Sequence, residues 1–178
     1  MSLSLDEARR IIEALIFAAP HPITVLEISN ILDLEQELVQ RIIEMIKEQY
    51  AKSGITLRVV AGGYQFVTRP EFAPWIEKIG RPVITTPLSA AGLETLAIVA
   101  YKQPISRSEI EEIRGVSSQS AINTLLEREL IVELGRRDGP GRPIIYGTTN
   151  QFLIHFGLKS LDDLPQVDNL PDYKSRDA

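Results

Sequence analysis

Apolar residues in the first fifty positions recur every three or four residues, in three groups, which is the spacing of amphipathic helices. The first group consists of Leu5, Ala8, Ile11, Ile12, Leu15 and Ile16. The second consists of Leu26, Ile28 and Ile31, and the third of Leu38, Val39, Ile42, Ile43 and Ile46. Pro20 and Pro22 end the first helix. Thr24 and Glu27 have the spacing of a capping box, which starts the second helix.

Alternation of apolar and polar residues follows this helical region and predicts two strands, Ile55–Ala61 and Tyr64–Thr68. Gly62 and Gly63 lie between them. They indicate a tight hairpin turn, because glycine adopts the positive φ angles that such turns require.

The same order of elements recurs in the second half of the chain. Ile16–Leu34 superposes without a gap on Ile98–Val116. Within this window Ile16, Ala18, Pro22, Ile23, Glu27, Ile28 and Ile31 recur as Ile98, Ala100, Pro104, Ile105, Glu109, Ile110 and Ile113. Ser106 replaces Thr24 and keeps the capping-box spacing to Glu109. A third helix with Ala121, Ile122, Leu125 and Leu126 and the strands Ile131–Arg137 and Ile144–Thr148 complete the second copy.

Three helices followed by a two-stranded hairpin, present twice, predict two winged helix-turn-helix domains in tandem. The fold class is therefore mainly α with small β wings. The predicted parts are a first domain over residues 1–80, a linker over 81–88, a second domain over 89–165 and a tail over 166–178. A short helix over Glu71–Ile79 leads into the linker, where Pro82 and Pro87 exclude helix. The tail is acidic, and we expect it to be mobile.

The composition is that of a folded soluble protein, with 44% apolar and 24% charged residues in a chain of 178. It contains no cysteine, which excludes disulfides and thiolate metal sites. The longest apolar stretches, Ala14–Ala19 and Ala97–Tyr101, are far shorter than the roughly 20 residues that cross a bilayer. The first residues are acidic, where a secretory signal is basic. We therefore expect a cytoplasmic protein without a membrane segment.

The predicted third helices argue against direct reading of DNA, although the winged-helix fold suggests it. The third helix of the first domain carries Glu35, Glu37, Glu44 and Glu48 against Arg41 and Lys47. In the second domain Arg128 lies between Glu127 and Glu129. Carboxylates repel phosphates, whereas each contact to DNA requires a cation. The net charge of −5 also disfavours a nonspecific coat on nucleic acid.

Basic residues cluster on the second hairpin, at Arg136, Arg137 and Arg142, with Asp138 among them. Three interpretations of this cluster remain open. It is a solvated hairpin tip, a contact to an acidic protein surface, or a direct contact to DNA.

Residues suited to catalysis are scarce. His21 and His155 are the only histidines, and we expect a structural role for each. The loop Gly139–Arg142 resembles a phosphate-binding loop only superficially, because it connects two strands and not a strand and a helix. We therefore expect no enzymatic activity, no cofactor, no metal and no small-molecule substrate.

Four blocks of the second half occur in the order and at the spacing of one known family. They are Leu93-Glu-Thr-Leu-Ala-Ile-Val-Ala-Tyr-Lys-Gln-Pro-Ile105, Glu109-Ile-Glu-Glu-Ile-Arg-Gly-Val116, Gly141-Arg-Pro-Ile-Ile-Tyr-Gly-Thr-Thr149 and Phe156-Gly-Leu-Lys-Ser-Leu-Asp-Asp-Leu-Pro165. The first half adds Glu13-Ala-Leu-Ile-Phe-Ala-Ala19 and Gly62-Gly-Tyr-Gln-Phe66. With these blocks the chain resembles the ScpB family, the bacterial segregation and condensation protein B. Gly92 departs from the pattern, since a better helix former is expected there.

The resemblance implies a non-enzymatic accessory subunit of a bacterial condensin complex. Proteins of this family form homodimers and bind the kleisin ScpA, which bridges the heads of the SMC ATPase. The complex acts in chromosome condensation and partition during cell division, so association with DNA and the nucleoid is mainly indirect. The alternative is a transcriptional regulator with tandem winged helices, which binds DNA sequence-selectively and with a steep salt dependence.

The first domain is the candidate dimerisation domain. Its candidate contact residues are Ile11, Ile12, Leu15, Ile16 and Phe17. They form an apolar stripe wider than the roughly 100° that a single small core needs. In the alternative interpretation, the short helix Glu71–Ile79 covers the surplus surface.

The second domain is the candidate kleisin-binding domain. Its candidate contact residues are Tyr101, Arg114, Arg136, Arg142 and Tyr146, because tyrosine and arginine are typical interface anchors. Each of them also has a structural alternative. In the structural alternative for Tyr146, which lies in a predicted strand, its ring packs inside the domain.

Overall fold

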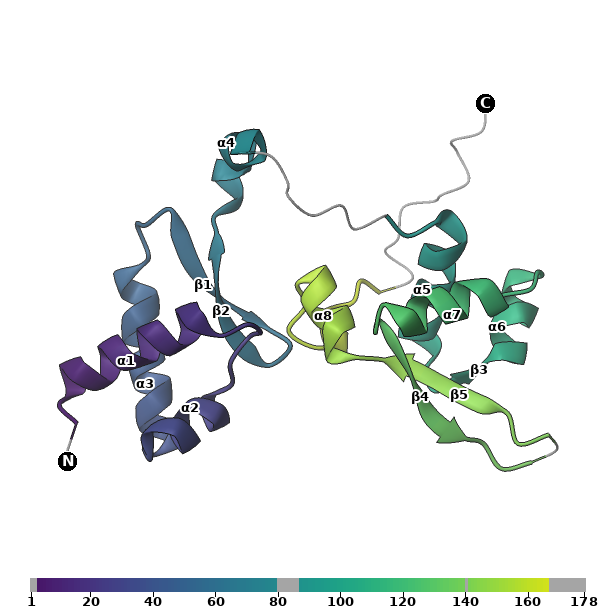
Figure 1. Ribbon diagram of the computed structural model, residues 1–178, viewed down its shortest axis with the longest axis horizontal. Coiled ribbons are helices and arrows are strands. Elements are labelled where there is room, and N and C mark those ends of the chain that lie inside the picture. Colours follow the sequence, from purple (N-terminus) through teal and green to yellow (C-terminus); the bar gives the residue numbers. More distant parts are fainter. Residues whose placement is uncertain (1–2, 80–86, 140, 167–178) are drawn as a thin grey trace.

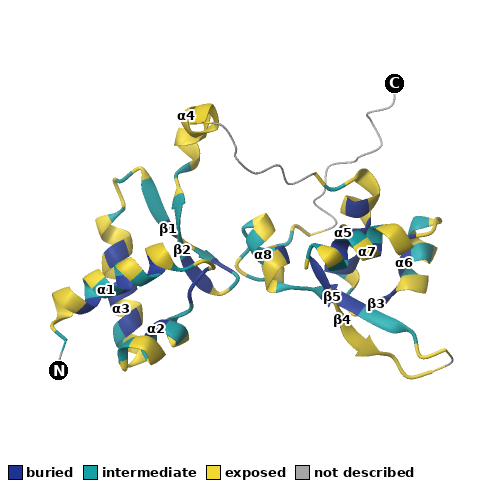
Figure 2. Cartoon of the chain, in the orientation of Figure 1, coloured by how far each residue is buried: buried dark blue, intermediate teal, exposed yellow. Residues whose placement is uncertain are grey.

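The chain folds into two units, each of which consists of helices followed by an antiparallel hairpin (Figure 1). The computed structural model describes residues 3–79, 87–139 and 141–166. Each unit has its own cluster of buried apolar side chains, and polar and exposed positions surround both clusters (Figure 2). The fold is therefore mainly α with small β wings, in the tandem winged-helix arrangement. Most of the predicted linker and of the predicted tail lies outside the described residues.

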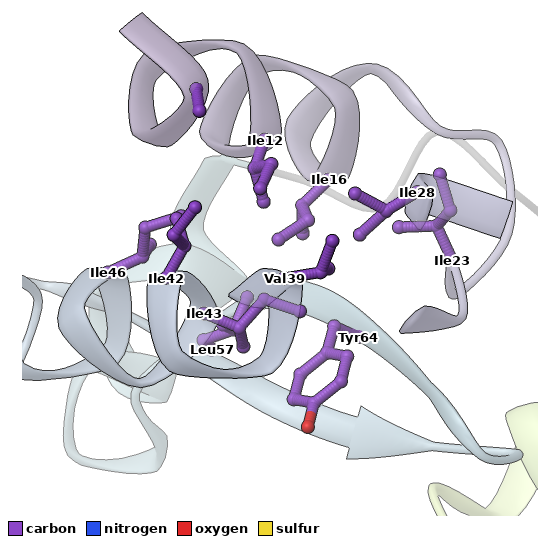
Figure 3. Close-up of a cluster of buried hydrophobic side chains, with 11 residues drawn as sticks. Ile12, Ile16, Ile23, Ile28, Val39, Ile42, Ile43, Ile46, Leu57 and Tyr64 are labelled. Carbon is purple, nitrogen blue, oxygen red and sulfur yellow. The ribbon is translucent and has the colours of Figure 1, made fainter. Parts of the chain in front are cut away.

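The first unit contains the three predicted helices and the hairpin. Its elements are α1 (Leu5–Ala18), α2 (Val25–Leu32), α3 (Gln36–Gln49), β1 (Ile55–Val60) and β2 (Gly63–Thr68). In its core, Ile12 and Ile16 of α1 point toward Ile42 of α3, and Ile28 of α2 lies beside them (Figure 3). These side chains meet because residues three or four apart share one face of a helix.

Both second helices begin with the predicted capping box. The backbone N–H of Thr24 donates to the Glu27 carboxylate at 2.7 Å, and the backbone N–H of Glu27 donates to the Thr24 hydroxyl at 3.2 Å. Ser106 and Glu109 repeat this pair of hydrogen bonds at 2.8 and 3.4 Å. The two side chains thus satisfy N–H groups that the first helical turn leaves without partners.

The first hairpin turns one residue earlier than the sequence indicates. Val60 pairs with Gly63, so the two turn residues are Ala61 and Gly62, with φ angles of 49° and 74°. Gly63 belongs to β2, and a Cβ atom there would lie 2.6 Å from the carbonyl carbon and oxygen of Pro22. Glycine is thus required at this position for close approach of two backbone segments, and not for the turn.

The predicted helix over Glu71–Ile79 is a succession of short turns. A 3₁₀ turn (Pro70–Phe72), the single-turn helix α4 (Ala73–Ile76) and a second 3₁₀ turn (Glu77–Ile79) follow one another. Every residue in them is exposed, including Trp75 at 64%. This segment extends away from the hairpin and adds nothing to the first core (Figure 1).

The second unit repeats the first and adds three short elements. Its elements are α5 (Ala90–Lys102), β3 (Ile105–Ser106), α6 (Arg107–Arg114), α7 (Gln119–Glu127), β4 (Ile131–Arg136), β5 (Ile144–Thr148), α8 (Asn150–Phe156) and a 3₁₀ turn (Leu161–Asp163). Its antiparallel sheet has the order β3-β5-β4. The two-residue strand β3 was not predicted, because a stretch this short carries no alternation. Within the described ranges, no helix has the length and apolar composition that a membrane crossing needs.

We predict that alanine substitutions at the two adjacent glycines differ in cost. Gly63→Ala should lower the free energy of unfolding by about 2 kcal/mol or more, because its Cβ meets backbone that has no free space to move into. Gly62→Ala should cost about 1 kcal/mol, since only its positive φ angle is strained. Urea denaturation of the full chain, followed by circular dichroism, measures both. Equal losses would contradict the steric role of Gly63.

Candidate partner-binding surfaces

The predicted dimerisation residues divide between the core and the surface of α1. Ile12 and Ile16 are completely or almost completely buried in the core of their own domain, so their assignment as contact residues is wrong. Ile11 and Leu15 are half-buried. Phe17, with 77% of its surface exposed, is the most exposed of the large apolar residues that α1 offers to a partner.

Phe17 forms one wall of a groove of about 290 Å³. The other lining residues are Arg10, Glu13, Ala14, Tyr50, Ile55 and Phe66. The Tyr50 hydroxyl donates to the Glu13 carboxylate at 2.6 Å, and this hydrogen bond raises the pKa of Tyr50. No residue of Glu71–Ile79 lines the groove. The interpretation in which that segment covers the apolar surplus of α1 is therefore wrong.

Two of the predicted kleisin contacts are structural residues. Tyr146 is only 6% exposed and packs in the second core, where its burial raises the pKa of its hydroxyl. The Arg114 side chain is also only 6% exposed. Its guanidinium donates to the Glu94 carboxylate at 3.0 Å and to the Ser118 hydroxyl at 2.9 Å. Because the Arg114 side chain is enclosed by its own domain and Tyr146 reaches only the lining of a recess, neither is an exposed interface anchor.

Tyr101 lies at an apolar groove of about 350 Å³ on the second domain. The other lining residues are Leu93, Leu96, Ala97, Ala100, Phe152, Phe156, Leu158, Leu164 and Pro165. The Tyr101 hydroxyl donates to the carbonyl of Pro165 at 2.7 Å, which ties the last described segment to α5. Apart from Tyr101, this groove was not predicted. The pair Leu93 and Ala97, exposed one helical turn apart on α5, was the available signal.

The wing arginines have different environments. Arg137 turns back onto its own domain, where it donates to the Glu109 carboxylate at 2.8 Å and to the Pro104 carbonyl at 3.0 Å. Arg136 and Arg142 are exposed, and the Arg136 guanidinium donates to the Arg142 carbonyl at 3.1 Å. The wing thus presents two cations to solvent and uses the third to attach itself to α6.

A polar recess of about 340 Å³ lies between α6, α7 and the wing. It contains Arg107 and Arg136 together with Glu133. Arg107 is engaged with Gln119 and, at 4.0 Å, with Glu111. A carboxylate in the recess and another at its edge disfavour a phosphate there. Among the described residues, no group of His, Asp and Glu side chains is arranged to hold a metal ion.

These features define a tandem winged-helix protein that offers apolar grooves and an arginine-bearing wing. The profile of the family described as segregation and condensation complex subunit ScpB matches residues 10–167, and the chain belongs to this family. Segregation and condensation protein B of Desulforamulus reducens is 48% identical over 165 residues, which cover 92% of this chain and 91% of that protein. The protein of the same name from Moorella thermoacetica is 46% identical over 167 residues, covering 93% and 85%.

Two solved structures are also similar. The crystal structure of ScpB from Mycobacterium tuberculosis is 34% identical and covers 89% of this chain and 99% of that chain, with a TM-score of 0.44. A crystal structure described as a dimer of the ScpB N-terminal domain complexed with ScpA peptide is 28% identical. It covers 42% of this chain and 96% of that chain, with a TM-score of 0.41.

We predict a pH-dependent contribution of Glu109 to stability. Hydrogen bonds from the Ser106 hydroxyl, then from Arg137 and the Ser106 backbone, lower the pKa of Glu109 from 4.5 to about 2. Since the folded state holds the ionised form, the stabilisation is fully present above pH 4.5. It is lost as the pH falls toward 2.

Urea denaturation of wild type and Glu109→Gln should therefore show a difference at pH 6.5 that shrinks at pH 3. Glu112→Gln, an exposed position on the same helix, controls for the loss of one negative charge. A wild-type advantage that is the same at both pH values would contradict this role of Glu109.

Proposed function

We propose that this chain is a non-enzymatic, homodimeric subunit of a bacterial condensin-like complex. It binds the kleisin ScpA and through it SMC, and it acts in the cytoplasm in chromosome condensation and partition. The observation that carries the proposal is the family match over residues 10–167, which extends across both domains. The grooves and the exposed wing supply surfaces for protein partners.

The dimer contact is assigned to the α1 face of the first domain. Phe17 and Ala14 lie on the same side of α1, and the groove that they line carries mainly apolar and aromatic side chains. An exposed phenylalanine at the edge of such a groove has the properties of an interface anchor. In a two-fold dimer, each Phe17 contributes to the same interface.

The kleisin contact is assigned to the second domain. The groove at Tyr101 is apolar, and the wing carries Arg136 and Arg142. An amphipathic segment of ScpA with carboxylates beside its apolar face suits both surfaces, since its apolar residues fill the groove and its carboxylates face the wing.

Direct reading of DNA is the less supported function. The N-cap of α3 is the exposed Glu35, and the exposed residues of the helix include Glu37, Glu44 and Glu48. In the second domain, Glu133 lies in the recess between α6, α7 and the wing, where its carboxylate repels a phosphate. Association with the chromosome is therefore assigned to the complex as a whole.

We predict that Phe17→Glu weakens the homodimer of the full chain by about 30-fold or more. Burial of a phenylalanine side chain contributes about 2 kcal/mol, and the carboxylate adds a desolvation cost. Sedimentation velocity at micromolar concentration measures the change. Ile31→Glu, which charges an equally apolar and 57% exposed position on α2, should leave the dimer intact. A similar effect of both variants would exclude the α1 face as the specific contact.

We predict that Ala97→Trp lowers the affinity for ScpA by about 10- to 100-fold, because the indole fills the groove that the kleisin segment occupies. Isothermal titration calorimetry with ScpA from the same organism measures the affinity. Ala91→Trp is the matched control, since Ala91 is exposed on the same helix but does not line the groove. Unchanged binding to Ala97→Trp would move the contact to another surface.

A further inference from the structure

The two domains contact each other through the tip of the first hairpin and the end of α8 (Figure 1). The backbone N–H of Ala61 donates to the carbonyl of Leu158 at 2.9 Å. One guanidinium nitrogen of Arg58 donates to the carbonyl of Gly157 at 2.6 Å. Donors from β1 and its turn thus reach two consecutive carbonyls of the other domain.

The carbonyls that accept these bonds are available because of the way α8 ends. The N–H of Gly157 bonds back to Ile154, and the N–H of Leu158 bonds back to Leu153, which is a Schellman ending. Gly157 and Leu158 follow the last residue of the helix, so their carbonyls take no part in its hydrogen bonding. A helix C-terminus also carries partial negative charge and therefore favours a cation such as the Arg58 guanidinium.

The donors are equally available on the first domain. Ala61 is the first turn residue of the hairpin, and its N–H faces away from the ladder that pairs β1 with β2. Arg58 is exposed and has no carboxylate partner among the described residues. The first domain therefore offers an N–H group and a guanidinium as donors, and the second domain offers two carbonyls that accept from them.

Gly157 permits this close approach. Its φ angle is +65°, and a Cβ atom there would lie 3.0 and 3.2 Å from the two terminal nitrogens of Arg58. A side chain at this position would therefore be strained and would crowd the guanidinium. The glycine serves both the helix ending and the contact between the domains.

We propose that Arg58 and the Ala61 N–H form a latch on the Gly157–Leu158 turn, and that this latch sets the angle between the two winged helices. Leu158 also lines the apolar groove of the second domain. The latch therefore holds the edge of that groove beside the first hairpin. The orientation of the two domains is a property of this chain itself, independent of any partner.

Distance measurements between spin labels test the latch in the full chain. The sequence has no cysteine, so Gln40→Cys on α3 and Glu112→Cys on α6 give one exposed label in each domain. Dilution with unlabelled chain keeps distances between chains out of the signal. The labelled wild type should give one narrow distance distribution. Arg58→Ala should broaden it, and Arg58→Glu should broaden it further, because a carboxylate faces the carbonyls.

Arg41→Glu is the matched control, since Arg41 is an exposed arginine of the first domain without a role in the latch. It should leave the distribution unchanged. A wild-type distribution as broad as that of Arg58→Glu would overturn the proposal. So would superimposable narrow distributions for all variants.

Hydrogen exchange at the Ala61 amide gives a second, local measurement. This amide lies in a hairpin turn, where exchange is normally fast, but the bond to Leu158 should protect it. Exchange should be roughly tenfold faster in Arg58→Glu than in wild type, while the amides of β2 are unaffected. An Ala61 amide that exchanges at the rate of a free turn in wild type would also overturn the latch. Neither measurement depends on dimerisation or on ScpA.

Discussion

Burial of branched aliphatic side chains between the first and third helices is the interaction on which each domain depends. In the first domain, α1 and α3 supply most of the buried residues, and almost all of these are isoleucine or valine. In the second, Leu96 and Val99 of α5 meet Ile122 and Leu125 of α7 in the same way. Domains of this size bury a modest fraction of their surface, so each buried methyl group matters.

The hairpins depend on the same helical packing. Leu57 of β1 and Tyr64 of β2 belong to the first core, and Ile131 of β4 and Tyr146 of β5 belong to the second. A two-stranded hairpin alone is marginally stable in water, and these residues attach each wing to its helices. The first wing is therefore held near its turn, where Tyr64 lies, whereas the second is held at its open end, where Ile131 and Tyr146 lie.

Periodicity and turn chemistry were sufficient to predict the fold from the sequence. The spacing of Ile12, Ile16 and Ile42 reports directly which helical faces are buried, and the Thr24–Glu27 and Ser106–Glu109 pairs report where helices begin. Both signals are local, so one sequence suffices to read them. The position of the first turn was displaced by one residue, because Gly63 is required by Pro22, a neighbour far away in the sequence.

The candidate surfaces were predicted less well, and for a physical reason. Arg114 and Tyr146 have side chains typical of interfaces, but the same chemistry also suits an internal ion pair and a packed ring. Only the fold decides between these uses. The contact of Arg58 was not predictable from the sequence, because its partner is a backbone carbonyl, a group that every residue carries. The groove at Tyr101 is assembled from α5, α8 and the residues after them, so its existence depends on tertiary contacts.

The bridge between Ile23 and Tyr64 joins the turn end of the first hairpin to the connection between α1 and α2. The turn residue Ala61 lies only three positions before Tyr64 on the same short ribbon. The turn end of the hairpin is therefore held from both sides, by Ile23 of its own domain and by the ending of α8 in the other. A displacement of the connection between α1 and α2 would therefore reach α8 through only the few residues of this turn, without passing along the length of the strands.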